Sequence, residues 1–145
     1  MTAFEGWSDL SAFLKTISTR HQDSWVSPTG HASIRFAYPF RGAELGVFFI
    51  HNKQEDGNDW FYIGVRGLPV GSFDLTKLVT DLPHGAVGAL ALAADFLCVG
   101  QTLPIAGLDR THVMSVIDRL CELAQEIEKH ARPVDARALF QYFVD

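Results

Sequence analysis

The chain has 145 residues, 48% of them hydrophobic and 12% aromatic, so it is long enough to enclose a core and too apolar to be disordered. Its formal net charge of −5 and the lack of any run of Lys or Arg argue against direct nucleic-acid binding. We also find no stretch with the composition of a signal peptide or a membrane span, and therefore expect a cytoplasmic protein with no membrane segment.

The first expected element is a helix over residues 8–20. Apolar side chains recur on one face of this segment, and Ser8 is its expected N-cap. The following polar segment, residues 22–30, ends in Ser-Pro-Thr-Gly, which is typical of a turn. The chain is therefore expected to leave the helix through a loop and to enter the first strand after residue 30.

Three strands are expected next, over residues 33–38, 44–52 and 60–66. The first alternates apolar and lighter side chains, as a strand with one buried face does. A turn over 39–43 and a charged loop over 53–59 separate the strands, so the three should form an antiparallel meander.

The second and third strands lack the alternation of apolar and polar residues that is expected of a sheet with one solvent-exposed face. Residues 47–50 are Val-Phe-Phe-Ile and residues 60–63 are Trp-Phe-Tyr-Ile, so both faces of these strands should be covered. Helices can cover one face, and the other needs a further layer from this chain or from another molecule. The candidate contact residues of that second face are Phe48, Ile50, Trp60 and Tyr62, with plain core positions as the alternative.

The next segment is expected to form a short helix and a hairpin. The helix holds apolar residues between 73 and 82, begins at Ser72 or Asp74, and ends at Pro83. Residues 86–105 fit either two strands that turn at 93–95 or a buried helix over 85–99, and we favour the hairpin.

The longest helical pattern runs from residue 108 to residue 132. Its apolar stripe repeats every three or four residues, Asp109 is the expected N-cap, and Pro133 ends it. The whole chain is thus expected to be α+β, with an antiparallel sheet of about five strands flanked by helices in the order α-β-β-β-α-β-β-α. We assign residues 1–132 to one domain and residues 133–145 to a helical C-terminal tail.

This order of elements resembles the fold shared by type III secretion chaperones and YbjN-like proteins, over about residues 7–132. The most suggestive local match is Leu90 to Leu92, a turn, and then Leu-Pro-Ile-Ala-Gly-Leu over 103–108, leading into the long helix. The segment 82–90 departs from the pattern because it is rich in Gly and Ala. The resemblance implies a heart-shaped subunit, commonly a homodimer, that binds other proteins and has no known catalytic activity.

The tail beyond residue 132 is dense in aromatic side chains. It includes Phe140 and Phe143, which could fold back over the chain's own sheet or dock on a second subunit or a client protein. Folding back is the simpler interpretation, and we keep Phe140 and Phe143 as candidate partner-binding residues.

The sequence predicts no catalytic, cofactor or metal site. No two of the six histidines have the i, i+4 spacing of helical metal ligands, and His51 and His112 are interpreted as surface residues. Cys98 and Cys121 lie in apolar patterns and are expected to be reduced core thiols. Gly64, Gly67 and Gly71 lack phosphate-loop spacing and are assigned to a bulge and a turn.

From the residues and the resemblance together we expect a non-enzymatic adaptor or chaperone-like protein that acts as a homodimer and binds a partner protein. The alternative is a ligand-sensing or regulatory domain with a small-molecule cavity between the sheet and the long helix.

Overall fold

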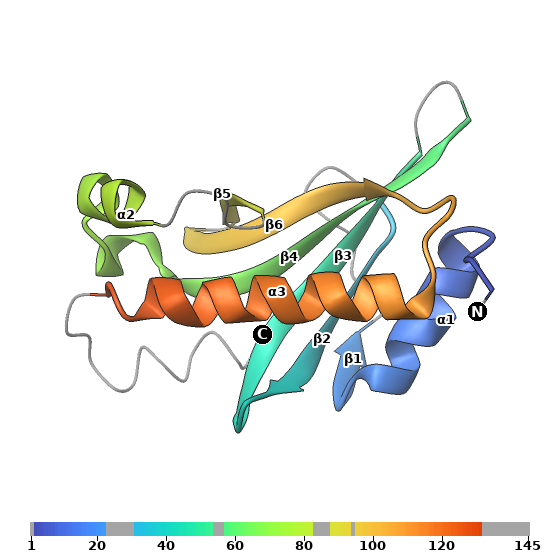
Figure 1. The fold of residues 1–145 in the computed structure, drawn as a ribbon, viewed down its shortest axis with the longest axis horizontal. Helices are drawn as coiled ribbons and strands as arrows, with labels where there is room; N and C mark the ends of the chain where they lie inside the picture. Colours follow the sequence, from blue (N-terminus) through green and yellow to red (C-terminus); the bar gives the residue numbers. More distant parts are fainter. Residues whose placement is uncertain (1, 23–30, 54–56, 83–87, 94, 132–145) are drawn as a thin grey trace.

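The computed structural model describes residues 2–22, 31–53, 57–82, 88–93 and 95–131. These residues form an α+β fold around one antiparallel sheet (Figure 1). In chain order the elements are α1 (Trp7–Ile17), β1 (Arg20–Gln22), β2 (Ser33–Phe40), β3 (Ala43–Lys53), β4 (Asp59–Pro69), the short 3-10 helix η1 (Val70–Ser72), α2 (Leu75–Asp81), β5 (Ala89–Ala93), β6 (Phe96–Pro104) and α3 (Arg110–Glu128).

The sheet has six strands in the order β1-β2-β3-β4-β6-β5. The meander β2-β3-β4 is followed by an excursion through α2 and β5, and β6 then returns to lie beside β4. The strand β5 therefore lies at one edge of the sheet, and the three-residue β1, which pairs with β2, lies at the other. The two ends of the segment that contains α2 and β5 are joined by a hydrogen bond, in which the Val70 N–H donates to the Asp95 carbonyl at 2.8 Å.

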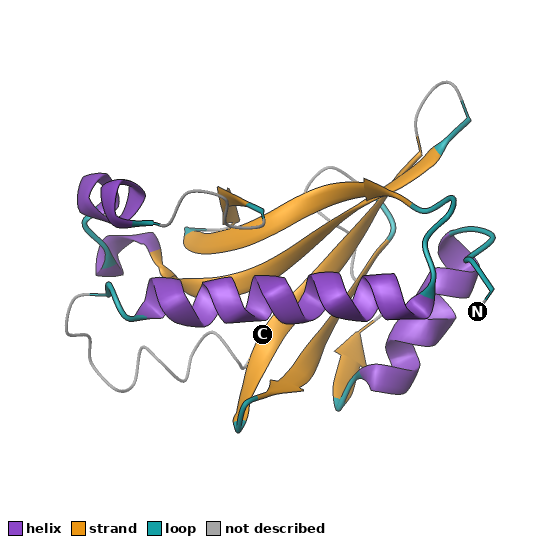
Figure 2. Cartoon of the chain, viewed as in Figure 1, coloured by secondary structure: helices purple, strands orange, loops and turns teal. Residues whose placement is uncertain are grey.

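The helices α1 and α3 cover one face of the sheet, and Figure 2 shows the long helix α3 lying across the strands on that side. Here Ile34, Val47, Phe49, Ile63 and Val65 are at most 1% exposed. They pack with Leu10 and Leu14 of α1 and with the apolar stripe of α3, namely Val113, Val116, Ile117, Leu120, Ala124 and Ile127. Removal of this apolar surface from water is the main stabilising contribution to the fold.

The predicted fold class and order of elements are confirmed. The hairpin over β5 and β6 turns at the expected place, so the alternative buried helix over 85–99 is wrong. The expected caps are also found: Asp74 accepts from the Lys77 N–H at the start of α2, and Asp109 accepts from the His112 N–H at the start of α3.

Other boundaries differ from the predicted ones. The helix α1 begins after Gly6 and not after Ser8, and it ends at Ile17. Beyond it, Thr19 donates its N–H to the Ala37 carbonyl and leads into the unpredicted strand β1. The helix α3 ends at Glu128, since the N–H groups of Lys129, His130 and Ala131 each reach a carbonyl only three residues back. The predicted tail 133–145, with Phe140 and Phe143, lies outside the described residues.

A candidate protein-binding face

The strand register places the four sequence-predicted contact residues together on the sheet face opposite α1 and α3. Ile50 pairs with Tyr62 across β3 and β4, and Tyr62 pairs in turn with Thr102 of β6. Phe48 and Trp60 lie two residues from these positions along their own strands, so they point to the same side. We call this side the open face and define it by Phe48, Ile50, Trp60, Tyr62, Arg66 and Thr102.

The run of apolar residues in β3 and β4 is thereby explained. Val47 and Phe49 alternate with Phe48 and Ile50, and the first two point to the helices while the other two point to the open face. None of the helices in the described part of the chain lies on the open face: α2 packs beside the end of α3, where Asp81 Oδ2 lies 3.9 Å from His130 Nδ1. Ile50, Trp60 and Tyr62 are half-buried, and Thr102 is exposed.

Aromatic rings on the open face lie across glycines of the neighbouring strand. A Cβ added to Gly64 would collide with the ring of Phe48, and a Cβ added to Gly100 would collide with the phenol of Tyr62. The two rings also contact each other, with centroids 5.8 Å apart and planes tilted by 36°. Because glycine has no side chain, the rings lie down on the backbone, and Phe48 is only 9% exposed.

The sequence pattern does not predict this use of glycine, and the assignment of Gly64 to a bulge is wrong. Gly64 lies in a regular part of β4 and pairs with Phe48 on one side and with Gly100 on the other. The register shift of β4 comes later, between Arg66 and Pro69, so the assignment of a bulge fits only Gly67. The signal that could have found the contact is cross-strand pairing, which a single strand's pattern does not contain.

Arginine side chains border the aromatic residues. Arg66 Cζ lies 3.7 Å from the centroid of the Phe96 ring, within the range of a cation–π interaction. Arg35 pairs with Phe48 across β2 and β3 and is half-buried on the same face. The open face therefore combines apolar and aromatic surface with guanidinium groups, the composition that is enriched in the centres of protein interfaces.

The Tyr62 hydroxyl stays protonated at neutral pH. Burial raises the pKa of this phenol above its ordinary value of 10.0, and the nearby Cys98 thiol adds to the effect. Tyr62 is thus an amphipathic ring with a neutral polar end, a residue type that interfaces favour.

His51, interpreted from the sequence as a surface residue, is half-buried and makes two side-chain contacts. Its Nε2 lies 3.0 Å from Asp59 Oδ1, and its ring stacks on Trp7 with centroids 5.0 Å apart and planes 12° apart. The His51 side chain is 20% exposed and that of Asp59 is 31% exposed. The contact fastens the start of α1 to the β3-β4 hairpin, and with Trp7 covering the ring we assign it a structural role.

Both cysteines are free and buried, as predicted. Burial raises the pKa of the Cys121 thiol to about 12, with a further contribution from the Asp118 carboxylate, so this sulfur is a poor nucleophile at neutral pH. Within the described residues no group of three or more His, Cys, Asp or Glu side chains is arranged to hold a metal ion.

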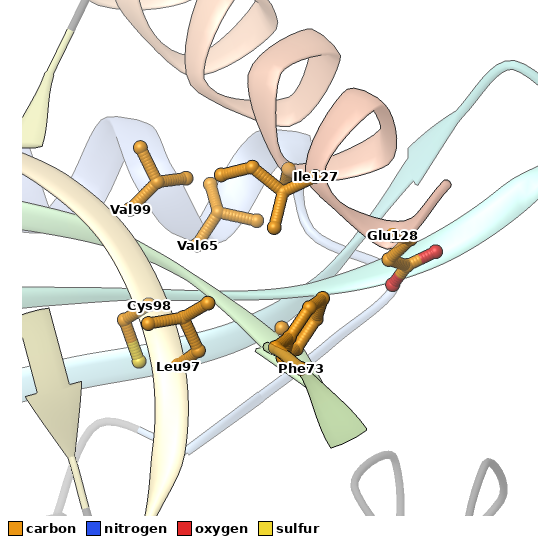
Figure 3. Close-up of a pocket in the computed structure, with 9 residues that line it drawn as sticks. Val65, Phe73, Leu97, Cys98, Val99, Ile127 and Glu128 are labelled. Atoms are coloured by element: carbon orange, nitrogen blue, oxygen red, sulfur yellow. The ribbon is translucent and has the colours of Figure 1, made fainter. Parts of the chain in front are cut away.

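A pocket lies between the C-terminal end of α3 and the strands β4 and β6 (Figure 3). Val65, Val99 and Ile127 form its apolar walls, and Glu128 is the one charged residue that lines it. Its volume of about 10 Å³ is room for a single water molecule. This pocket gives no support to the alternative of a ligand-sensing domain, because a small-molecule site needs several hundred Å³, about 300 or more.

Comparison of the chain with protein-family models, with curated proteins and with solved structures finds no match. In the part of the chain that the structure describes, every helix is too short or too polar to cross a lipid bilayer.

Proposed function

We propose that this protein is a non-enzymatic adaptor or chaperone-like protein, that it acts as a homodimer in the cytoplasm, and that the open face binds a partner protein. The observation that carries the proposal is the set of half-buried apolar side chains, Ile50, Trp60 and Tyr62, on a sheet face that none of the described helices covers. The two free cysteines fit a reducing compartment.

The geometry favours a partner that presents apolar side chains from an extended segment or a helix. The rings of Phe48 and Tyr62 lie over Gly64 and Gly100, so they protrude little from the sheet between Ile50 and Thr102. A partner side chain that packs there would remove the remaining exposed apolar surface of Ile50, Trp60 and Tyr62 from water, which contributes about 25 cal/mol for each Å² buried before the costs of association. Phe48 is already buried, with only 9% of its surface exposed, and would contribute by holding the neighbouring Tyr62 ring in place.

The first step of the test is to identify the partner by a photo-crosslink from the open face. A benzophenone amino acid is placed at Trp60 in one variant and at Ser115, on the exposed side of α3, in the matched control. We expect cross-linked partner protein in the cells of origin from position 60 and not from position 115. Equal cross-linking from both positions would contradict a specific open-face site.

The second step measures affinity for the purified cross-linked partner. Thr102→Lys adds a charge at an exposed position directly across from Tyr62, where it leaves the core unchanged, and Ser115→Lys is its control. Isothermal titration calorimetry should give at least about a tenfold weaker Kd for Thr102→Lys, because the lysine must be desolvated at the interface, and an unchanged Kd for Ser115→Lys. An unchanged Kd for Thr102→Lys would overturn the proposal.

A further inference from the structure

The edge strand β5 differs from the opposite edge of the sheet in having no charge. Its sequence is Ala-Leu-Ala-Leu-Ala, and within the described residues it pairs only with β6. At the other edge, Arg20 of β1 forms an ion pair with Glu44, with Nη2 and Oε1 3.5 Å apart. Charged side chains on an edge strand discourage pairing with another chain, whereas an uncharged apolar edge permits it.

The sequence of β5 is a palindrome, which gives it a property that most strands lack. If two copies pair antiparallel about a two-fold axis at Ala91, then each Ala91 meets the other Ala91, and each Leu90 meets Leu92 of the second copy. Alanine would pair with alanine on one side of the joined sheet and leucine with leucine on the other. The strand would therefore meet identical side chains in a second copy of itself, with no like charges to oppose the pairing.

The exposed leucines lie where such pairing would cover them. Leu90 and Leu92 pair with Val99 and Leu97 and so point to the helix side of the sheet. Leu90 packs against the core, but Leu92 is 63% exposed. In the joined sheet Leu92 would pack on Leu90 of the second copy, and the four leucines would form one apolar cluster.

The helix α2 adds exposed apolar surface. Like β5, it lies at the end of the molecule away from β1 (Figure 1). Leu75 is 42% exposed and Val79, one turn later, is 62% exposed. In the described part of the chain the large exposed hydrophobic side chains are Leu75, Val79 and Leu92, and all of them belong to α2 or β5. Such a concentration is typical of an interface more than of a solvated surface.

We propose that two copies of this chain form a dimer through antiparallel pairing of their β5 strands about a two-fold axis at Ala91. The proposal rests on the homodimer in the proposed function and specifies its interface. The two sheets would join into one of twelve strands, and because the axis is perpendicular to the sheet, both open faces would lie on the same side. A partner protein could then contact both subunits at once, which raises its apparent affinity.

Disulfide trapping tests the register directly. Opposed residues in an antiparallel pair have Cα atoms about 4.5 to 5.5 Å apart, within the reach of a disulfide, so Ala91→Cys should yield a covalent dimer under mild oxidation. Leu92→Cys alone should not form a covalent dimer, because residue 92 of one copy faces residue 90 of the other. A mixture of Leu90→Cys and Leu92→Cys should therefore give covalent heterodimers. The native thiols do not interfere, since Cys98 and Cys121 are 2% and 0% exposed.

A charge at the axis tests the same interface without a covalent bond. In Ala91→Lys two ammonium groups would face each other, and light scattering and sedimentation should show a dimer Kd raised by about tenfold or more. Ala106→Lys, at an exposed position between β6 and α3, is the matched control and should leave the dimer intact. Circular dichroism establishes that both variants are folded.

The outcomes separate this inference from the proposed function. A wild-type dimer that neither traps through Ala91→Cys nor responds to Ala91→Lys would overturn the β5 interface while leaving a homodimer in place. A wild-type protein that is monomeric at tens of micromolar would overturn both. Loss of partner binding in Thr102→Lys is independent of either result, because Thr102 lies on β6 and not at the edge.

Discussion

The hydroxyl of Tyr38 donates a 2.7 Å hydrogen bond to Asp118 Oδ1, which joins β2 to the middle of α3 across 80 residues of sequence. Tyr38 is 7% exposed as a whole residue, and the bond gives its part-buried hydroxyl a partner. The bond links an outer strand of the meander to the long helix, whose main strand contacts are with β4 and β6.

Removal of this bond should destabilise the protein. For Tyr38→Phe we expect the free energy of unfolding to fall by about 1–2 kcal/mol, as for a part-buried hydrogen bond to a charged group. Urea denaturation of Tyr38→Phe, Asp118→Ala and the double variant gives the coupling energy between the two residues. Additive effects of the two single substitutions would contradict a direct interaction.

The protein should lose stability above pH 9. Burial raises the pKa of Cys121 from 9.0 to about 12, and burial together with the hydrogen bond to Asp118 raises that of Tyr38 above 10.0. Above pH 9 the unfolded chain releases the Cys121 proton while the folded chain keeps it, so the contribution of this thiol is complete below pH 9 and is lost between pH 9 and about 12.

Chemical denaturation at intervals from pH 8 to pH 11 measures this loss. One proton gives a slope of up to about 1.4 kcal/mol per pH unit. The Cys121→Ala variant should show a shallower slope than the wild type, even though its stability at pH 8 is lower. Equal slopes for the two proteins would mean that Cys121 does not carry the effect.

Gly64→Ala should be destabilising although alanine is usually the better residue in a strand. The added Cβ would collide with the ring of Phe48, which must then rise from the sheet, and we expect a cost of about 1–3 kcal/mol. Gly71→Ala is the control, because its Cβ would meet no atom within 4 Å, and its effect should be within about 0.5 kcal/mol. Thermal denaturation of the two variants measures the difference, and a neutral Gly64→Ala would show that the ring moves freely.

Much of the fold could be predicted because its signals are local. The stripe of α3, the cap at Asp109 and the hairpin of β5 and β6 are each set by residues close to one another in the sequence. The strand β1 was missed because Arg-His-Gln carries no apolar alternation, and its pairing with β2 depends on residues 13 to 17 positions further along the chain.

The candidate face was predicted in part. Alternation along a strand is enough to place Phe48 with Ile50, and Trp60 with Tyr62, but only the register between β3 and β4 brings the two pairs to the same side. The contacts of Phe48 with Gly64, of Arg66 with Phe96 and of His51 with Trp7 join different elements. No periodicity within one segment encodes them.

The return of β6 to the side of β4 has a consequence for how quickly the molecule assembles. The hairpin between β2 and β3 closes through the two residues Arg41 and Gly42, both in the left-handed conformation that suits a tight turn, and it needs little chain entropy to form. Pairing of Trp60 with Pro104 must instead close a far longer loop, and the chain entropy is lost before the stabilising contacts form. Formation of the β4-β6 ladder is therefore the step that we expect to govern the folding rate, with the meander as its template.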